Sequence, residues 1–431
     1  MKKNYLKGMI SFCVSGMMAL AMAAPVFADK TDAKEAYITK EFDMPVGTTI
    51  PDTTFTFDMK DIKKDGQTST ETISTKSITF TNNDTKRIID VNGAGNDHKI
   101  YRYLKTTPLL NDEDVTNLKK DGPGVYEFTI TETQGVETPQ PTTANNTETT
   151  TTTTYSDAEY KATVYVKKDD TGNYISTIKV TKEKDDQGNE VTDENAKKVD
   201  PSQPDDNIPG SGGLRFVNTY LKEIKDTGTV APDPITPDPS DPTKPDVSRD
   251  KIFSVGKITT GDMADTNKKF QFTVKVTAPA LAKNASSKTY TAKVIDADGK
   301  PDGEALIFNN GVAQTVNLAH GEKLVFSDLY VGTAFEAQET DDDTVYTSTT
   351  YALLNGGVPA QKSVPAQKSK ERELVTGNVS EGTDTVVVVN THNSNSPTGI
   401  FVNNLPYILI VLGVLAGFVG YIAAKRKSEE R

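Results

Sequence analysis

The strongest constraint on the fold of this 431-residue chain is an alternation of apolar and polar residues in two long regions. Phe55 and Phe57 alternate with threonine in the first region, and the run from Phe270 to Val276 alternates with polar residues in the second. Alternation at period two is typical of strands that are buried on one face. Helical periodicity is missing from any long stretch of these regions. The sequence therefore predicts an all-β protein built from two β-sandwiches.

A proline-rich joint separates the two regions. It covers residues 222–250, where closely spaced prolines favour an extended, semi-rigid spacer. The joint divides the chain into a first domain, residues 29–221, and a second domain, residues 251–393. A Thr-rich stretch, residues 134–156, is predicted to form a long loop in the first domain, because threonine favours extended backbone but adds no core.

The first 28 residues have the layout of a secretory signal peptide. Basic residues precede an apolar run from Met9 to Ala24, and small residues follow this run. Cleavage after Ala28 would make Asp29 the first residue of the mature chain. The alternative is an N-terminal anchor helix, which the short run and its small-residue exit disfavour.

The C-terminal end has three parts in a fixed order. A short polar motif, residues 395–399, precedes an apolar segment, residues 405–424, and a positively charged tail, residues 425–431. The apolar segment has the length that crosses a hydrocarbon core. The motif resembles a variant of the LPxTG sorting signals of Gram-positive surface proteins, with Asn-Ser in place of Leu-Pro. That resemblance implies that a sortase cuts between Thr398 and Gly399 and transfers the Thr398 carboxyl to an amine.

Charge and residue usage disfavour several classes of function. The formal net charge of −12 argues against nucleic-acid binding, which needs basic patches. The single cysteine, Cys13, lies in the predicted signal peptide, so the mature chain has no thiolate ligand. The three histidines have no metal-ligand spacing, and no phosphate loop, nucleophile elbow or dinucleotide fingerprint occurs. We expect no metal, no cofactor and no enzymatic turnover.

Three charged or polar residues of the first region share strand parity with apolar residues. Lys40, Glu132 and Asn218 each stand two positions from a large apolar side chain within an alternating run. If those apolar residues face the core, the lysine, the glutamate and the asparagine face it too.

The second region repeats this trio as Lys257, Glu339 and Asn390. In both regions we expect the lysine on a first strand, the glutamate on a penultimate strand and the asparagine on a last strand. The four valines before Asn390 leave its phase ambiguous from the sequence alone.

Two kinds of explanation fit such trios. The ordinary ones are a buried Lys–Glu ion pair with asparagine as a hydrogen-bond partner, or three residues that end their strands in solvent. The chemical one starts from desolvation, which lowers the pKa of a lysine and raises that of a glutamate. A neutral amine is a nucleophile, and a protonated glutamate can polarise the asparagine amide and carry the proton. The product is a Lys–Asn isopeptide bond, with one ammonia lost.

The trios lie in segments that read ITKEF, PGVYEFTITE and RFVNTY, then VGKITTG, VGTAFEAQE and VVVVNTHN. These segments resemble the major (backbone) pilins of Gram-positive cocci, of the T-antigen type. The resemblance implies two tandem Ig-like (CnaB-like) domains, each closed by a Lys–Asn isopeptide bond that an acidic residue promotes. Carried over by local motif, these are Lys40–Asn218 with Glu132 and Lys257–Asn390 with Glu339.

The same resemblance implies a covalent homopolymer on the cell wall, reached through a transient membrane precursor. Sortase would join Thr398 of one subunit to a lysine in the first domain of the next. Lys182, at a strand end, and Lys197 or Lys198, shortly before the last strand, are the candidate acceptors. The expected partners are a pilin-type sortase, peptidoglycan or a base pilin, and a host surface protein. The alternative function is a monomeric wall-anchored adhesin that holds a host protein.

Overall fold

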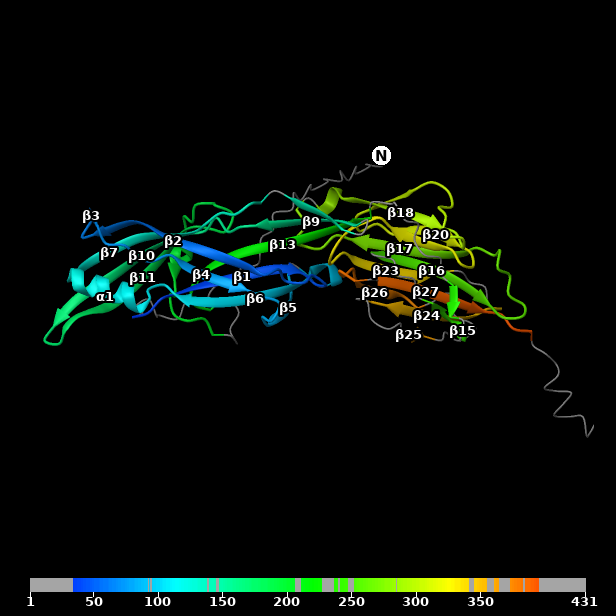
Figure 1. Cartoon of the computed structure of the whole chain (residues 1–431), viewed down its shortest axis with the longest axis horizontal. Helices are drawn as coiled ribbons and strands as arrows, with labels where there is room; N and C mark the ends of the chain where they lie inside the picture. The colour runs from blue at the N-terminus through cyan, green and yellow to red at the C-terminus, as the bar shows by residue number, and fades with distance from the viewer. Residues whose placement is uncertain are drawn as a thin grey trace, which may run out of the picture.

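The computed structural model of the chain is elongated and consists mostly of β-strands (Figure 1). The predicted all-β fold is confirmed. The predicted signal peptide, sorting motif, apolar segment and tail lie outside the described residues, as do parts of the joint. No helix within the described part of the chain is long and apolar enough to cross a membrane. The structure describes residues 34–91, 93, 95–137, 139–144, 147–205, 211–226, 236–238, 241–246, 252–283, 285–340, 345–354, 360–363, 373–382 and 384–394.

The first region folds into two sheets around one hydrophobic core. The first sheet has the order β5 (Lys86–Asp90), β6 (Lys99–Pro108), β1 (Tyr37–Pro45), β13 (Leu214–Asp226), β9 (Thr147–Thr154) and β8 (Gln140–Ala144). The second sheet has the order β12 (Lys198–Val199), β11 (Gly172–Lys184), β10 (Glu159–Asp169), β7 (Gly124–Glu132), β2 (Thr53–Lys64) and β3 (Gln67–Thr68), with β4 (Lys76–Phe80) also paired to β2.

The second region has the same two-sheet plan around a core of its own. Its larger sheet has the order β19 (Leu306–Asn309), β18 (Thr289–Ile295), β21 (Lys323–Phe326), β16 (Phe253–Thr260), β27 (Asp384–Thr391), β24 (Thr347–Leu353) and β25 (Ala360–Ser363). Its smaller sheet has the order β20 (Gln314–Leu318), β17 (Phe270–Thr277), β23 (Ala334–Glu339) and β26 (Val375–Asn378). Within the joint, β14 (Thr236–Asp238) pairs with β15 (Asp241–Asp246).

The alternating residues that predict strands are the residues that fill the two cores. Phe55 and Phe57 on β2 are buried, and so are the four apolar residues from Phe270 to Val276 on β17. Phe42 on β1 meets the ring of Phe55 edge to face, with centroids 5.0 Å apart. Such aromatic pairs add to the stability that the buried area itself supplies.

The first and last strands of each region lie side by side and run parallel. In the first region β1 pairs with β13, and in the second β16 pairs with β27. Most other neighbouring strands in the two regions are antiparallel, as expected for sandwiches. The parallel pair matters for the site, because it brings the two ends of each region's sequence onto adjacent strands.

The Thr-rich stretch is a β-hairpin, so the predicted loop is wrong. Strands β8 and β9 pair with each other, and β9 continues the sheet by pairing with β13 from Thr154↔Thr219 to Thr147↔Asp226. β-Branched threonine fits an extended strand, and the free edge of β13 supplies the hydrogen-bond partner that the prediction lacked.

A ten-residue helix, α1 (Asp112–Asp121), is the longest helix among the described residues. Its N-cap is Asn111, and Asp114 completes a capping box with it. This pairing satisfies two N–H groups that a helix start otherwise leaves unbonded. The short elements η1 (Asn96–His98), α2 (Glu194–Lys197) and η2 (Ala285–Ser287) complete the described structure.

Strand β13 joins the two regions. It continues past residue 221, where the sequence places the start of the joint, and pairs with β22 (Asp328–Tyr330) of the second region. Ile224 packs into the core of the second region. Figure 1 shows β13 reaching from the first sandwich toward the second. One unbroken strand therefore contributes to both cores.

Candidate functional site

The parallel strands of the first region place Lys40 and Asn218 on the same core-facing side of one sheet. Lys40 lies opposite Phe216 in the β1–β13 register, and Asn218 is two residues further along β13. Glu132, the last residue of β7, reaches the pair from the facing sheet. The three side chains therefore come from both layers of the sandwich and meet in its interior.

The Glu132 carboxylate binds both other residues of this cluster. Lys40 Nζ donates to Glu132 Oε2 over 2.7 Å, and Asn218 Nδ2 donates to Glu132 Oε1 over 2.8 Å. The side chains of Lys40 and Glu132 are fully buried. The ring of Phe55 lies 4.6 Å from Lys40 Nζ and makes the surroundings apolar. The amine and the amide that would react are thus held by one carboxyl group away from water.

Burial shifts both ionisable groups of this cluster toward their neutral forms. Desolvation lowers the pKa of the Lys40 amine from its ordinary 10.5 to about 8, although the Glu132 carboxylate opposes the shift. Desolvation also raises the pKa of the Glu132 carboxyl, against the opposing charge of Lys40. Proton transfer from the ammonium to the carboxylate gives a neutral nucleophile beside a neutral acid, the state that amide chemistry needs.

The second region repeats this geometry. Lys257 on β16 lies opposite Val388, and Asn390 is two residues further along β27. Lys257 Nζ donates to Glu339 Oε2 over 2.7 Å, and Asn390 Nδ2 donates to Glu339 Oε1 over 2.8 Å. The phase of Asn390, ambiguous in the sequence, is therefore inward. All three residues are fully buried, and the ring of Phe270 lies 4.1 Å from Lys257 Nζ.

The order of strands differs from the prediction in one respect. Neither glutamate lies on a penultimate strand, because several strands follow both β7 and β23 before the last strand of each region. The glutamates instead share a place in the fold, at the C-terminal end of a strand in the sheet that faces the lysine. The sequence analysis missed the strands that lie between each glutamate and the last strand of its region.

A third buried lysine–acid pair contrasts with the first cluster. Lys76 and Asp114 form an ion pair whose side chains are 6% and 3% exposed. Burial would raise the pKa of the Asp114 carboxyl, but hydrogen bonds from Lys76 and from the backbone of Ser74 and Asn111 hold it below its usual value. This acid stays charged, so the pair is a structural ion pair rather than a reactive one.

The three candidate acceptor lysines differ in exposure. The Lys182 side chain is 13% exposed and lies 3.4 Å from Asp186, and the Lys197 side chain lies 3.2 Å from Glu183. Lys198 is exposed on β12, a strand at the end of its sheet. Of the three, Lys198 is the most open to another protein. The predicted cleavage residues Ala28, Asp29, Thr398 and Gly399 lie outside the described residues.

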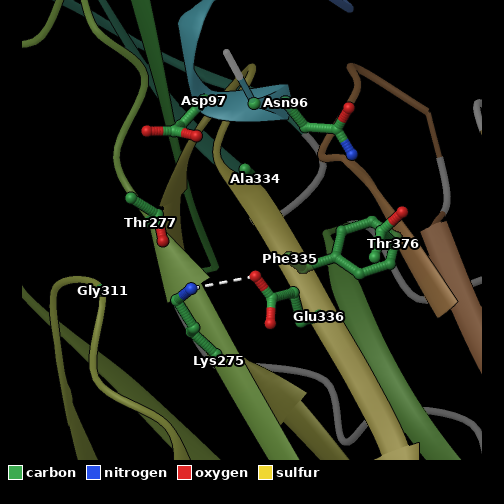
Figure 2. Close-up of a pocket in the computed structure, with 10 residues that line it drawn as sticks. Asn96, Asp97, Lys275, Thr277, Gly311, Ala334, Phe335, Glu336 and Thr376 are labelled. Carbon is green, nitrogen blue, oxygen red and sulfur yellow. Dashed lines mark hydrogen bonds and ion pairs between the residues drawn. The ribbon is translucent and has the colours of Figure 1, made fainter. Parts of the chain in front are cut away.

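A pocket of about 580 Å³ lies where the two regions meet, away from both clusters. Figure 2 shows Asn96 and Asp97 of η1 on one side of it and Lys275, Phe335 and Glu336 of the second region on the other. Lys275 and Glu336 form an ion pair of 2.9 Å within it. The pocket contains none of the predicted site residues. A reaction between two side chains of one core needs no such cavity.

Two serines that the sequence analysis did not single out contact the buried asparagines. The backbone N–H of Ser156 donates to Asn218 Oδ1, and the Ser348 hydroxyl donates to Asn390 Oδ1. The sequence holds no usable signal for Ser156, because the donor is a backbone group. Ser348 is one polar residue among several in the segment TSTTYALL, and only the pairing of β24 with β27 places it opposite Asn390.

The fold and these clusters define a class of protein: tandem β-sandwiches, each with a lysine, a glutamate and an asparagine buried across its first and last strands. The second region, residues 253–392, matches a family described as a domain of unknown function (DUF7601). Comparison with curated protein sequences finds no relative.

Among solved structures, the chain is similar to a point mutant of the major pilin of Streptococcus pyogenes, with 17% identity, a TM-score of 0.32, and coverage of 84% of this chain and 100% of the pilin. It is also similar to the major pilin T3.2 of that species, with 16% identity, a TM-score of 0.29, and coverage of 84% and 99%. A pilus-presented adhesin, Cpa, has 15% identity, a TM-score of 0.23, and coverage of 55% and 36%. At such values the function has to be argued from the residues of this chain.

Proposed function

We propose that this chain is the structural backbone subunit of a sortase-assembled pilus on a Gram-positive cell surface, and that a Lys–Asn isopeptide bond closes each of its regions. One observation carries the proposal. In both regions a buried carboxyl group binds a lysine amine and an asparagine amide at once. The same cluster in two separate cores argues for a shared chemistry rather than for two isolated buried ion pairs, which stabilise little.

The chemistry follows from the contacts. The glutamate takes a proton from the lysine ammonium, and the neutral amine attacks the asparagine carboxamide carbon. The glutamate then gives its proton to the amide nitrogen, which it already contacts, and takes up a second proton from the attacking lysine nitrogen, so that ammonia leaves and a neutral amide remains. Each glutamate acts once, inside its own sandwich, so the reaction has no turnover.

Cross-links at these positions suit a fibre under tension. Each bond would join a first strand to the last strand that runs parallel beside it. A pull that enters through one strand would pass to the other through a covalent bond instead of through ladder hydrogen bonds. By the chain-entropy argument used for disulfides, closing such a long loop also stabilises the fold by roughly 5 kcal/mol.

The intact mass of the mature chain tests the cross-links. We expect a deficit of two ammonia molecules relative to the sequence. Glu132→Ala should restore one of them and Glu339→Ala the other, because each variant removes the acid of one cluster only. A full mass for the unaltered, folded protein would refute the proposal.

Polymerisation would use Thr398 and an exposed lysine, and the exposure of Lys198 makes it our first choice. We expect Lys198→Arg to abolish SDS-resistant ladders in cell-wall extracts, while Lys182→Arg and Lys197→Arg preserve them. Arginine keeps the charge but cannot take part in the transfer. Ladders that persist in all three variants would exclude these acceptors, and a single band from the unaltered protein would favour a monomeric adhesin.

A further inference from the structure

The side-chain oxygen of each buried asparagine accepts a hydrogen bond from a segment next to the asparagine strand, on the side away from the lysine strand. Asn218 Oδ1 accepts from the backbone N–H of Ser156 over 2.7 Å, and Asn390 Oδ1 accepts from the Ser348 hydroxyl. Both serines are buried, at 1% and 0% exposure. The carbonyl that the lysine would attack is therefore held by a donor that is not part of the Lys–Glu–Asn cluster.

The two donors come from corresponding parts of the two sandwiches. The strand order is β1-β13-β9 in the first region and β16-β27-β24 in the second. Ser156 follows β9 by two residues, and Ser348 lies on β24 directly opposite Asn390. In each region the lysine strand flanks one side of the asparagine strand. The donor comes from the strand on the other side in the second region, and from just past the end of that strand in the first.

We propose that these donors form an oxyanion site in each region and that Ser348 is a catalytic residue of the second bond. The inference rests on the proposed cross-linking reaction and adds a fourth participant to it. When the neutral lysine amine attacks the carboxamide carbon, the C=O electron pair moves to Oδ1. A fixed donor aimed at that oxygen stabilises the charge as it develops, in a core from which water is excluded.

The step balances without any further reagent. The step starts from the neutral amine and the protonated glutamate. The Nζ–Cγ bond forms, the glutamate delivers its proton to Nδ2, and it then takes up the proton that the lysine nitrogen loses. The C–N bond to Nδ2 then breaks, Oδ1 returns to a carbonyl, and ammonia leaves. The serine donor keeps its proton throughout, so its role is electrostatic.

The two regions differ in a way that makes the inference testable. The donor to Asn390 is a side chain and disappears when Ser348 becomes alanine. The donor to Asn218 is a backbone N–H, which remains when Ser156 becomes alanine. That substitution removes the Ser156 hydroxyl and with it the hydrogen bond to Asp186, so it changes the cluster without removing the donor. The matched control is therefore Ser254→Ala, because Ser254 is as buried as Ser348 and its hydroxyl pairs with the Thr385 hydroxyl rather than with either cluster.

The test follows both bonds in the same molecules over time. The full chain is made by cell-free synthesis and quenched with acid at intervals, and cross-linked peptides containing Lys40–Asn218 and Lys257–Asn390 are quantified by mass spectrometry. Loss of one such donor slows acyl-transfer enzymes by about 10²–10³-fold. We expect Ser348→Ala to slow the Lys257–Asn390 bond on that order and to leave the Lys40–Asn218 bond unchanged. Ser348→Thr, which keeps the hydroxyl, should restore the rate to within a few fold, and Ser254→Ala should leave both rates unchanged.

Ser348→Cys covers the case in which the alanine variant does not fold, since a thiol is a near-isosteric but weak donor. This variant should fold, and only the formation of the Lys257–Asn390 bond should be slower in it. The inference would be overturned if the Lys257–Asn390 bond formed as fast in Ser348→Ala as in the unaltered chain. If the alanine variant does not fold, the same comparison uses Ser348→Cys. A Ser348→Thr variant as slow as Ser348→Ala would also overturn it. Slowing of the Lys257–Asn390 bond by Ser254→Ala to the same extent would also overturn it, because the loss of any buried hydroxyl would then have the same effect. An unaltered chain without either cross-link would instead refute the proposed function itself.

Discussion

At the scale of single residues, identical residue types behave differently according to what surrounds them. Lys40 and Lys76 both lie buried beside a carboxyl group. Burial raises the pKa of the Glu132 carboxyl that Lys40 contacts, whereas hydrogen bonds lower the pKa of the Asp114 carboxyl that Lys76 contacts. The two carboxyl groups receive a similar number of hydrogen bonds, so the opposite shifts follow from burial, which is deeper around Glu132.

The pH dependence of stability tests the lowered pKa of Lys40. In an Asn218→Ala variant no bond can form, so the amine stays free. Its folded pKa of about 8 lies below the ordinary 10.5, so the unfolded state binds more protons between these values. The free energy of unfolding should therefore rise with pH over that window, by about 3 kcal/mol in total.

Urea denaturation followed by circular dichroism measures this rise. The matched control is Lys40→Met in the same Asn218→Ala background, which keeps all other titrating groups. The raised pKa of Glu132 has the opposite effect, because the folded state then holds a proton that the unfolded state has lost, and stability falls as pH rises. Equal slopes for the two variants above pH 8 would contradict the lowered pKa.

At the scale of elements, the start of α1 is tied to the sheet by one carboxylate. Asp114 accepts bonds from Lys76, from Ser74 and from the backbone N–H of Asn111. Asp114→Ala would leave the Lys76 ammonium buried without its ion-pair partner. We expect a loss of about 3 kcal/mol in the free energy of unfolding, the usual cost of breaking a buried ion pair. Glu113→Ala is the control, because Glu113 is the neighbouring residue and is exposed. A similar loss of unfolding free energy in both variants would show that the contacts of Asp114 with Lys76 and Ser74 do not stabilise α1.

The elements also show which parts of the fold a sequence can predict. Parity placed Lys40, Glu132 and Asn218 inward because strand alternation is a local property. The Thr-rich β9 was out of reach, since its strand depends on the edge of β13, which is distant in sequence. Ser156 was out of reach for a stronger reason: its donor is a backbone group that every residue except proline possesses.

At the scale of the whole molecule, one carboxylate ties the two regions together beside β13. Glu381 accepts from the backbone N–H of Thr49 over 2.7 Å and from Lys222 Nζ over 2.7 Å. Glu381→Ala should remove both contacts and let the regions move against each other. The expected result is a wider distribution of distances between spin labels placed in the two regions.

Asp302→Ala is the control for this prediction, because Asp302 pairs with Lys269 within the second region at an exposed site. The pairing of β13 with β22 remains in both variants, so neither should unfold. An unchanged distance distribution in Glu381→Ala would mean that the remaining contacts, which include the β13–β22 pairing and the hydrogen bond from Asn378 Nδ2 to the Asn96 carbonyl, fix the two regions without it.

That shared strand has a consequence for any assembly of this chain. Bending between the sandwiches would have to break the backbone bonds from β13 to β22 and withdraw Ile224 from its packing. Each copy should therefore behave as a stiff rod of fixed length, with curvature confined to the junctions between successive copies. The persistence length of a filament would then be a property of those junctions, and electron micrographs should show straight segments one subunit long.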